Sequence, residues 1–256
     1  MLNAFFGDCF DHCVPPLDFQ DVDQLEPFSS CPEDLLCSVE EIQWLLEHLD
    51  TSKSNGPDGI SAKMLKLTAS SIAPSITNLF NVSIRTGCFP AFWKTSNVVP
   101  VPKSNNRHEP SNYRPISLLP ILGKLIEHHI HFLITDHLSL YHPISDSQWG
   151  FQVGKSTVSA LLTSTHEWLQ HLEAGQDVCA IFFDLRKAFD SVPHRSLLAK
   201  LKLLNLHPVL MRWICSYLMG RTQRVVIDGE SSGPIHVLSG VPQGSVLGPL
   251  LFSYIY

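Results

Sequence analysis

Apolar residues recur every three or four positions in six stretches of this 256-residue chain, and each stretch predicts an amphipathic helix. Ser38 and Glu41 form a capping-box pattern at the start of the first helix. Gly87 and Gly175 follow the second and fourth, as expected of left-handed residues that end helices. The predicted helices span about residues 38–49, 74–86, 122–133, 158–172, 191–204 and 208–218.

Four other stretches predict β-strands. Residues 97–102 are extended, and the two prolines among them suit an edge strand. Residues 178–183 form an apolar run rich in β-branched and aromatic side chains, which is typical of a core strand. Residues 221–227 and 234–238 flank a glycine-containing turn and predict a hairpin. We expect the hairpin to pair antiparallel with strand 178–184, with helices packed on one face.

Composition indicates a globular protein, because 44% of residues are hydrophobic and 16% are charged. The net charge of −6 is divided unevenly: residues 1–50 hold 12 Asp and Glu with no Lys or Arg, and the rest hold 18 Lys and Arg against 12 Asp and Glu. Residues 1–37 are therefore expected to form an acidic, loosely structured extension. The part after residue 50 has a mild basic excess, which suits contacts to phosphate.

The start of the chain and the cysteines argue against secretion. Met1 to Phe10 contain no basic residue, and no apolar run approaches the ~18–20 residues that span a bilayer. The seven cysteines are scattered without a Cys-x-x-Cys pair, which argues against a disulfide framework and a structural zinc site. We interpret Cys9 with Asp11-His12-Cys13 as a chance grouping, and His128, His129 and His131 as solvated residues on polar helix faces. An intracellular protein of the nucleus or cytoplasm is expected, with no membrane contact.

Asp184 is the most informative single residue, because it ends the apolar run 178–183. A carboxylate at the end of a core strand is costly to desolvate unless a positive group meets it. A divalent cation suits this role, since hard cations bind carboxylate oxygens. A strand-end Asp that caps the next turn is the alternative, and this segment by itself leaves both open.

Five segments in a fixed order resemble the reverse transcriptases of non-LTR (LINE-type) retrotransposons. The segment at 182–190 is similar to the first catalytic palm motif, and the segment at 239–249 to the nucleotide-pocket motif. Three upstream segments match the same family. In this sequence the five read Ser54-Asn-Gly-Pro-Asp-Gly-Ile60, Val99-Pro-Val-Pro-Lys103 through Asn112-Tyr-Arg-Pro-Ile-Ser-Leu118, Gln148-Trp-Gly-Phe151 through Ser156-Thr157, Phe182-Phe-Asp-Leu-Arg-Lys-Ala-Phe-Asp190, and Ser239-Gly-Val-Pro-Gln-Gly-Ser-Val-Leu-Gly-Pro249.

The resemblance implies an α+β fold: part of a right-hand polymerase, with fingers and the first part of the palm. It implies antiparallel palm strands packed by helices, and no thumb. Residues 38–175 would form an N-terminal helical region and the fingers, and residues 176–256 a partial palm. Residues 97–256 match the reverse transcriptase domain, incomplete at its C-terminal side.

The resemblance also implies a site. Asp184 would be the catalytic carboxylate and would bind Mg²⁺ (or Mn²⁺) together with the backbone carbonyl of Leu185. The dNTP-binding residues would be Lys103, Arg114, Lys187, Ala188, Phe189, Gln243 and Gly244. Partners would be an RNA template, a DNA primer and dNTP.

Two of these positions need comment. Phe189 matches the aromatic steric gate that excludes a ribose 2′-hydroxyl, but a core Phe at a strand–helix turn is an equal alternative. Gln152 stands where family members often have Arg, so a phosphate or template contact would be lost.

Family members continue from a segment like Leu250-Leu-Phe252 to a Tyr-x-Asp-Asp hairpin that supplies further carboxylates. The sequence has Tyr254-Ile-Tyr256 there and contains no Tyr-x-Asp-Asp. We therefore expect a truncated RNA-directed DNA polymerase with little or no activity. The alternative is a decayed or domesticated fragment that binds nucleic acid or protein without catalysis.

Overall fold

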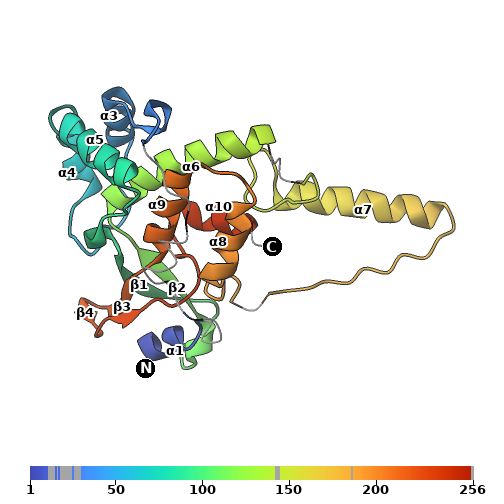
Figure 1. The fold of residues 1–256 in the computed structure, drawn as a ribbon. Helices are drawn as coiled ribbons and strands as arrows, with labels where there is room; N and C mark the ends of the chain where they lie inside the picture. Colours follow the sequence, from blue (N-terminus) through green and yellow to red (C-terminus); the bar gives the residue numbers. More distant parts are fainter. Residues whose placement is uncertain are drawn as a thin grey trace.

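The computed structural model describes residues 1–10, 15, 17, 25, 30–141, 145–185 and 187–254 (Figure 1). Cys13 and its neighbours Asp11 and His12, considered above as a metal grouping, lie outside the described residues, as does most of the predicted acidic extension. The α-helices are α1 (Leu2–Gly7), α3 (Val39–Glu47), α4 (Ala62–Leu67), α5 (Ala69–Thr86), α6 (Ile121–Tyr141), α7 (Thr157–Glu173), α8 (His194–Lys202), α9 (Pro208–Leu218) and α10 (Leu247–Ser253). The strands are β1 (Thr95–Pro102), β2 (Tyr113–Leu118), β3 (Thr222–Ile227), β4 (Glu230–Ser231) and β5 (Ile235–His236), and the 3₁₀ turns are η1 (Glu33–Leu35), η2 (Ala91–Trp93) and η3 (Pro110–Asn112).

The six predicted helices are present as α3, α5, α6, α7, α8 and α9. Ser38 caps α3 as predicted, with its Oγ accepting the Glu41 N–H at 3.0 Å. The reciprocal half of the capping box is wrong, because the Glu41 carboxylate contacts His129 instead. Helix α5 begins before its predicted start and continues through Pro74, and Gly87 ends it with a φ of +63°. No described helix is both long and apolar enough to cross a membrane.

The strands form one mixed sheet in the order β2-β1-β3-β4, with β5 also paired to β3. Strand β1 is antiparallel to β2 and parallel to β3, so the edge-strand prediction for residues 97–102 is wrong for the first half of β1. The pairing with β3 ends at Val98 opposite Val225. Pro100 and Pro102 lie beyond that point, where only β2 pairs with β1, and there they remove no hydrogen bond to β3.

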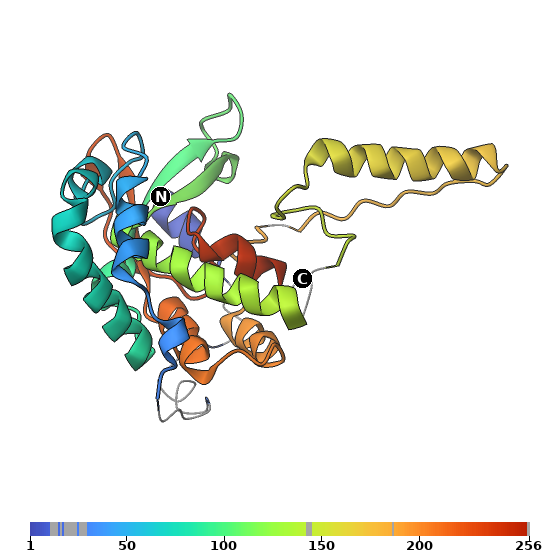
Figure 2. The ribbon, with the colours of Figure 1, turned by 90° about the horizontal axis from the view of Figure 1, so that it is seen from above.

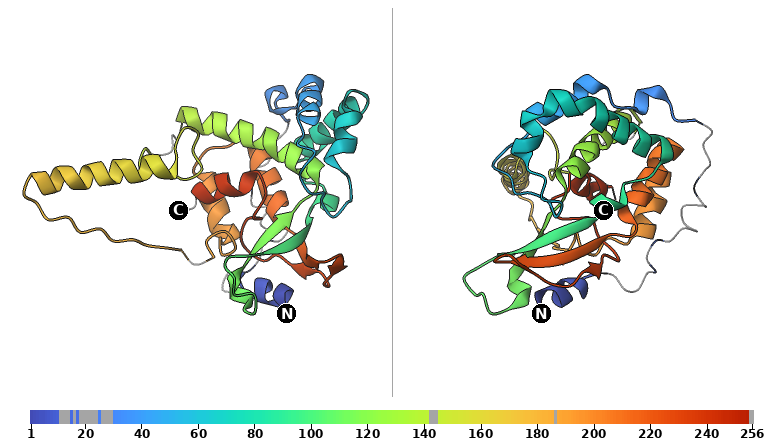
Figure 3. Two further views of the ribbon diagram at one scale, coloured as in Figure 1. Left: turned by 180° about the vertical axis from the view of Figure 1, so that it is seen from behind. Right: turned by 90° about the vertical axis from the view of Figure 1, so that its left-hand side faces the viewer.

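Helices cover both faces of the sheet, rather than one face as predicted. Figure 3 shows α6, α9 and α10 above the sheet and α1 beneath it. On the α1 side, Phe6 packs against Val98 and Val225, and these three side chains are 3%, 0% and 5% exposed. The first residues of the chain are therefore part of the packed structure.

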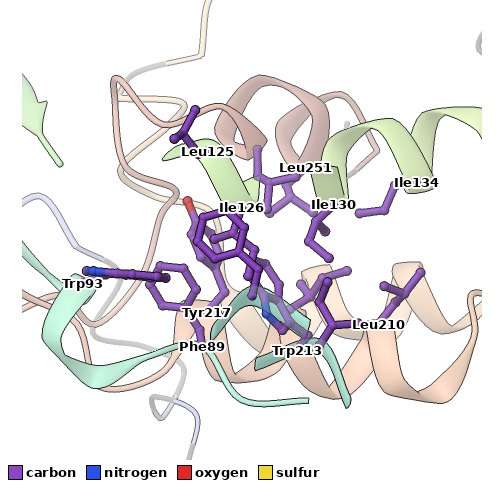
Figure 4. Packing of buried hydrophobic residues seen from close by; sticks show 14 of the residues in the cluster. Phe89, Trp93, Leu125, Ile126, Ile130, Ile134, Leu210, Trp213, Tyr217 and Leu251 are labelled. Carbon is purple, nitrogen blue, oxygen red and sulfur yellow. The ribbon is translucent and has the colours of Figure 1, made fainter. Parts of the chain in front are cut away.

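The main core lies between α5, α6, α9 and α10 (Figure 4). The Phe89 ring packs edge-on against Trp213 and Tyr217, with centroids 5.2 Å apart in both pairs. Aromatic pairs of this geometry add to the free energy gained from apolar burial. Ile126 and Ile130 of α6 close this cluster with no exposed surface. The core therefore fixes α6, α9 and α10 relative to one another.

The predicted strand 178–184 does not form. Helix α7 projects away from the body of the protein, and residues 174–185 return alongside it in extended form without strand pairing (Figures 1 and 2). Ile181, Phe182 and Phe183 are 72%, 84% and 90% exposed. A strand needs a neighbour that supplies hydrogen-bond partners, and β3 is already paired with β1 on one side and with β4 and β5 on the other. The predicted partner strand β3 therefore has no free edge for the apolar run.

Candidate functional site

A cleft of about 360 Å³ collects most of the residues that the sequence singled out. Four separate parts of the chain form its walls: the ends of β1 and β2, the segment after residue 183, the loop between β5 and α10, and α1. The predicted site residues that line it are Lys103, Arg114, Asp184, Leu185, Lys187 and Gln243. Residues from the first helix to the loop before the last one thus share one concave surface.

The basic wall comes from the β1–β2 hairpin. Lys103 follows β1, and its N–H donates to the Asn112 carbonyl at 2.8 Å, which continues the hairpin pairing. Its Nζ donates to the Ser111 carbonyl at 2.9 Å. Arg114 lies on β2 opposite Val101 and is exposed. The hairpin therefore holds two cationic side chains at the same end of the sheet.

The opposite wall carries Asp184. Its side chain is exposed, and Leu185 beside it is 50% exposed. Lys187 has a left-handed backbone with a φ of +54°, and its Nζ lies 4.8 Å from the centre of the Phe5 ring of α1. Asp184 and Leu185 thus line a cleft together with three cationic residues, Lys103, Arg114 and Lys187. This combination suits a cation together with a polyanionic ligand.

The loop 239–244 is held against β2 at its far end. The Ser117 N–H donates to the Gln243 carbonyl at 2.8 Å. Gly244 has a φ of +114°, and a Cβ atom there would lie 2.7 Å from the Ser117 carbonyl oxygen. Glycine is required at this position, because any side chain would push the loop off the strand.

The same loop is bound at its other end to the segment that precedes α8. The N–H of Gly240 donates to the Val192 carbonyl at 2.8 Å, and that of Val241 to the Phe189 carbonyl at 2.9 Å. His194, which sequence reasoning missed, donates from Nε2 to the Gly240 carbonyl at 2.7 Å. Burial lowers the pKa of His194, so its imidazole is held neutral.

Asp190 also lines the cleft, and it does not cap the helix that follows it. Gln243 Nε2 donates to Asp190 Oδ1 at 3.1 Å, whereas Pro193 is the N-cap of α8 and no side chain caps that helix. Burial raises the pKa of the Asp190 carboxyl, and the Gln243 hydrogen bond and the charges of Lys187 and Lys103 oppose that rise. Its membership in the 182–190 motif was the signal in the sequence.

Three predicted site residues are not among those that line the cleft. The Phe189 ring stacks on Phe252, with centroids 4.6 Å apart, and meets Phe151 edge-on at 5.8 Å. This placement matches the packing alternative, and the steric-gate role stays a prediction. Ala188 lies in the turn 187–190, and Gly244 lets the loop approach the backbone of β2 closely. Gln152, noted above for its departure from Arg, has a buried Nε2 atom without a hydrogen-bond partner.

A buried carboxylate that sequence reasoning missed holds the loop's C-terminal side. Glu127 of α6 is 1% exposed, and its Oε2 accepts the N–H groups of Val246 and Leu247 at 2.8 and 3.1 Å. Burial raises the pKa of Glu127, and the Arg221 charge opposes this. Position 127 lies off the apolar stripe that the sequence predicts for this helix, so no local signal marked it; α10 packing against α6 buries it.

Comparison with known proteins identifies the family of this chain. The family described as reverse transcriptase (RNA-dependent DNA polymerase) matches residues 101–256, which include β2, α10 and all the cleft residues outside the N-terminal segment. This match covers more than half of the chain.

Individual relatives point the same way. A probable RNA-directed DNA polymerase from transposon BS of Drosophila melanogaster is 36% identical over 217 residues, 84% of this chain and 24% of that protein. The RNA-directed DNA polymerase from mobile element jockey of Drosophila funebris is 34% identical with the same coverage. A Pol polyprotein from the type-1 retrotransposable element R1 of Bradysia coprophila is 29% identical over 262 residues. The chain spans about a quarter of the length of each of these three relatives. The chain belongs to the reverse transcriptase family, in its LINE-type, non-LTR retrotransposon branch.

Proposed function

We propose that this chain forms the fingers and the first part of the palm of an RNA-directed DNA polymerase, and that its cleft binds the triphosphate of an incoming dNTP. The observation that carries the proposal is the convergence of Asp184, Arg114 and Gln243 in one cleft from three distant segments. The division into fingers at 38–175 and partial palm at 176–256 stays a prediction.

The cationic wall supports a polyphosphate ligand. Arg114 presents a planar guanidinium that binds two phosphate oxygens at once, and it is exposed at the cleft. Lys103 and Lys187 add two point charges on either side. Gln243 offers an amide that reaches neutral polar atoms of the sugar or base, and its Nε2 is already oriented by Asp190.

The donor set of the cleft fits one divalent cation. The Asp184 carboxylate and the Leu185 carbonyl supply the oxygen ligands that Mg²⁺ or Mn²⁺ prefers. When bound, such an ion neutralises charge on the phosphates of the nucleotide. Asp184 and Asp190 are the only carboxylates among the described residues that line the cleft, and Asp190 is engaged by Gln243. A two-ion site needs more converging carboxylates, so residues 1–256 are expected to bind nucleotide rather than to polymerise it.

The polymer ligands proposed are an RNA template and a DNA primer. The excess of Lys and Arg after residue 50 supports a weak, salt-sensitive affinity for a duplex. We place the protein in the nucleus or the cytoplasm, where such templates occur.

The test measures dNTP binding to residues 1–256 by equilibrium dialysis, with and without Mg²⁺. Arg114→Ala and Lys103→Ala should each weaken binding about tenfold, because each removes a charge-assisted contact of about 1.5 kcal/mol. Lys63→Ala, on the exposed surface of α4, is the matched control and should leave the affinity unchanged.

The metal role is tested in the same assay. Asp184→Asn should remove the gain in dNTP affinity that Mg²⁺ produces, and Asp177→Asn, on the same exposed segment, should preserve it. Equal affinity in all variants would overturn the cleft as the nucleotide site. Salt-sensitive binding of primer–template without any dNTP binding would favour the alternative, a non-catalytic nucleic-acid-binding fragment.

A further inference from the structure

A second cluster of chemically reactive side chains lies outside the cleft. Cys37 precedes α3, Glu41 lies in the first turn of α3, and His129 lies in the middle of α6. One ligand atom from each lies within 4.8 Å of the other two. Cys37 is 5% exposed and His129 is 4% exposed. The sequence led us to expect a solvated His129 on a polar helix face and no structural zinc site. His129 is instead buried, and it meets Glu41 of α3.

The hydrogen bonds of His129 fix which ring nitrogen faces the cluster. Its Nε2 lies 2.9 Å from the Leu35 carbonyl oxygen, and a carbonyl can only accept, so Nε2 carries a hydrogen. Nδ1 is then the atom directed at the cluster, 2.7 Å from Oε1 of Glu41. A histidine that binds a metal through one nitrogen usually donates its other N–H to a carbonyl or carboxylate. The ring is thus oriented as a ligand would be.

The position of Cys37 is fixed by its backbone. Its N–H donates to Asn81 Oδ1 at 2.8 Å, and its carbonyl accepts from Asn81 Nδ2 at 3.0 Å. Asn81 belongs to α5, so a third helix holds the thiol in place. Glu41 is the accessible member, because its side chain is 36% exposed. The Cys37 and His129 donors are therefore buried and held in place, whereas the Glu41 carboxylate is reached by solvent.

We propose that Cys37, Glu41 and His129 bind a Zn²⁺ ion, with a water molecule in the fourth position on the Glu41 side. A sulfur, an imidazole nitrogen and a carboxylate oxygen together suit Zn²⁺, whereas Mg²⁺ and Ca²⁺ require oxygen ligands. The thiolate and the carboxylate balance the charge of the ion. On binding, the ion displaces the thiol proton of Cys37 and the proton that Nδ1 and the Glu41 carboxylate share in its absence, and both protons leave to solvent. The bound ion joins the segment before α3 to α6.

The experiment titrates residues 1–256 with Co²⁺, which takes the place of Zn²⁺ and absorbs light when bound. We expect one equivalent to produce the thiolate-to-cobalt charge-transfer band and the strong visible bands of a tetrahedral site, and Zn²⁺ to remove both. Cys37→Ser should abolish the charge-transfer band. Glu41→Gln and His129→Gln should lower the Zn²⁺ affinity at least about tenfold, the lower limit seen even for partners that only orient a ligand.

Matched controls come from the same chain. Cys88→Ser replaces an exposed thiol, and His128→Gln replaces the exposed neighbour of His129 in α6; both should bind the metal as the unsubstituted protein does. Zn²⁺ should also raise the thermal unfolding midpoint of the unsubstituted protein but not that of Glu41→Gln, whose partly exposed side chain can change without disrupting the core. Absence of the charge-transfer band in the unsubstituted protein, or its persistence in Cys37→Ser, would overturn the site.

Discussion

The side-chain amide of Gln243 donates to Oδ1 of Asp190 at 3.1 Å, and this bond joins two motifs that are 53 residues apart. The Ser239 hydroxyl adds a bond to the Asp190 carbonyl at 2.7 Å. The two motifs therefore act as one unit, whose carboxylate, amide and backbone positions depend on each other.

The pH dependence of stability should report the burial of Asp190. Its pKa is raised in the folded protein, so the folded state holds this proton more tightly than the unfolded state. Its contribution to stability is complete below the unfolded pKa of about 4 and is lost as pH rises through the folded pKa. Asp190→Asn keeps an oxygen for Gln243 and cannot ionise. Urea unfolding from pH 3 upward should therefore show this variant gaining stability relative to the unsubstituted protein, and a pH-independent difference would contradict the prediction.

Gly240→Ala should destabilise the protein strongly. Gly240 has a φ of +84°, and an added Cβ would lie 2.6 Å from the Phe189 carbonyl oxygen. The left-handed conformation alone costs a non-glycine residue about 1–3 kcal/mol, and the contact with backbone adds to it, so we expect a loss of at least about 2 kcal/mol. Gly150→Ala is the control, because a Cβ there meets nothing within 4 Å. Similar urea midpoints for the two variants would show that the loop does not require this close approach.

Substitutions of Glu127 should separate hydrogen bonding from charge. Glu127→Ala leaves the buried N–H of Leu247 and the half-buried N–H of Val246 without an acceptor, at a cost of about 1–3 kcal/mol for the buried one. Glu127→Gln keeps an acceptor oxygen and removes the burial of a charge, so its unfolding free energy should stay within about 1 kcal/mol of the unsubstituted protein. Denaturant unfolding of both variants measures whether Glu127→Ala is the less stable of the two. An equal loss of unfolding free energy in both would assign the effect to the charge.

Phe182 and Phe183 should promote association without contributing to stability. They are 84% and 90% exposed next to the apolar surface of α7. Replacing both with Ser should lower the light scattering of concentrated protein, because large exposed apolar patches favour self-association. The free energy of unfolding should change by less than about 0.5 kcal/mol, as for other surface substitutions. A large loss of stability would show that these rings are buried in solution.

Residues 1–256 should not incorporate dNTP on a primer–template above background, with either Mg²⁺ or Mn²⁺. A two-ion reaction needs several converging carboxylates, and Asp184 and Asp190 are those available among the described residues of the cleft. Primer extension with purified protein measures this. Extension that disappears in Asp184→Asn would refute the prediction and would show that these two carboxylates suffice.

Local sequence determined the elements whose signals are short in range. The apolar spacing of α9, the cap at Ser38 and the left-handed Gly87 each act within one or two helical turns, so they could be identified without knowing the fold. The ordered motifs were equally informative about the family, and the reverse transcriptase match over residues 101–256 confirms that family.

Only the tertiary structure decided which strands pair and which polar residues meet. The apolar run 178–183 predicted burial, but burial requires a partner, and β3 is occupied on both sides by β1, β4 and β5. Likewise, the 3.6-residue period places His129, seven residues after Leu122, on the apolar stripe of α6. That Glu41 and the Leu35 carbonyl meet it there is decided by the packing of α3 and η1 around α6. Periodicity specifies which face of an element is apolar, whereas long-range packing specifies what that face and its polar exceptions contact.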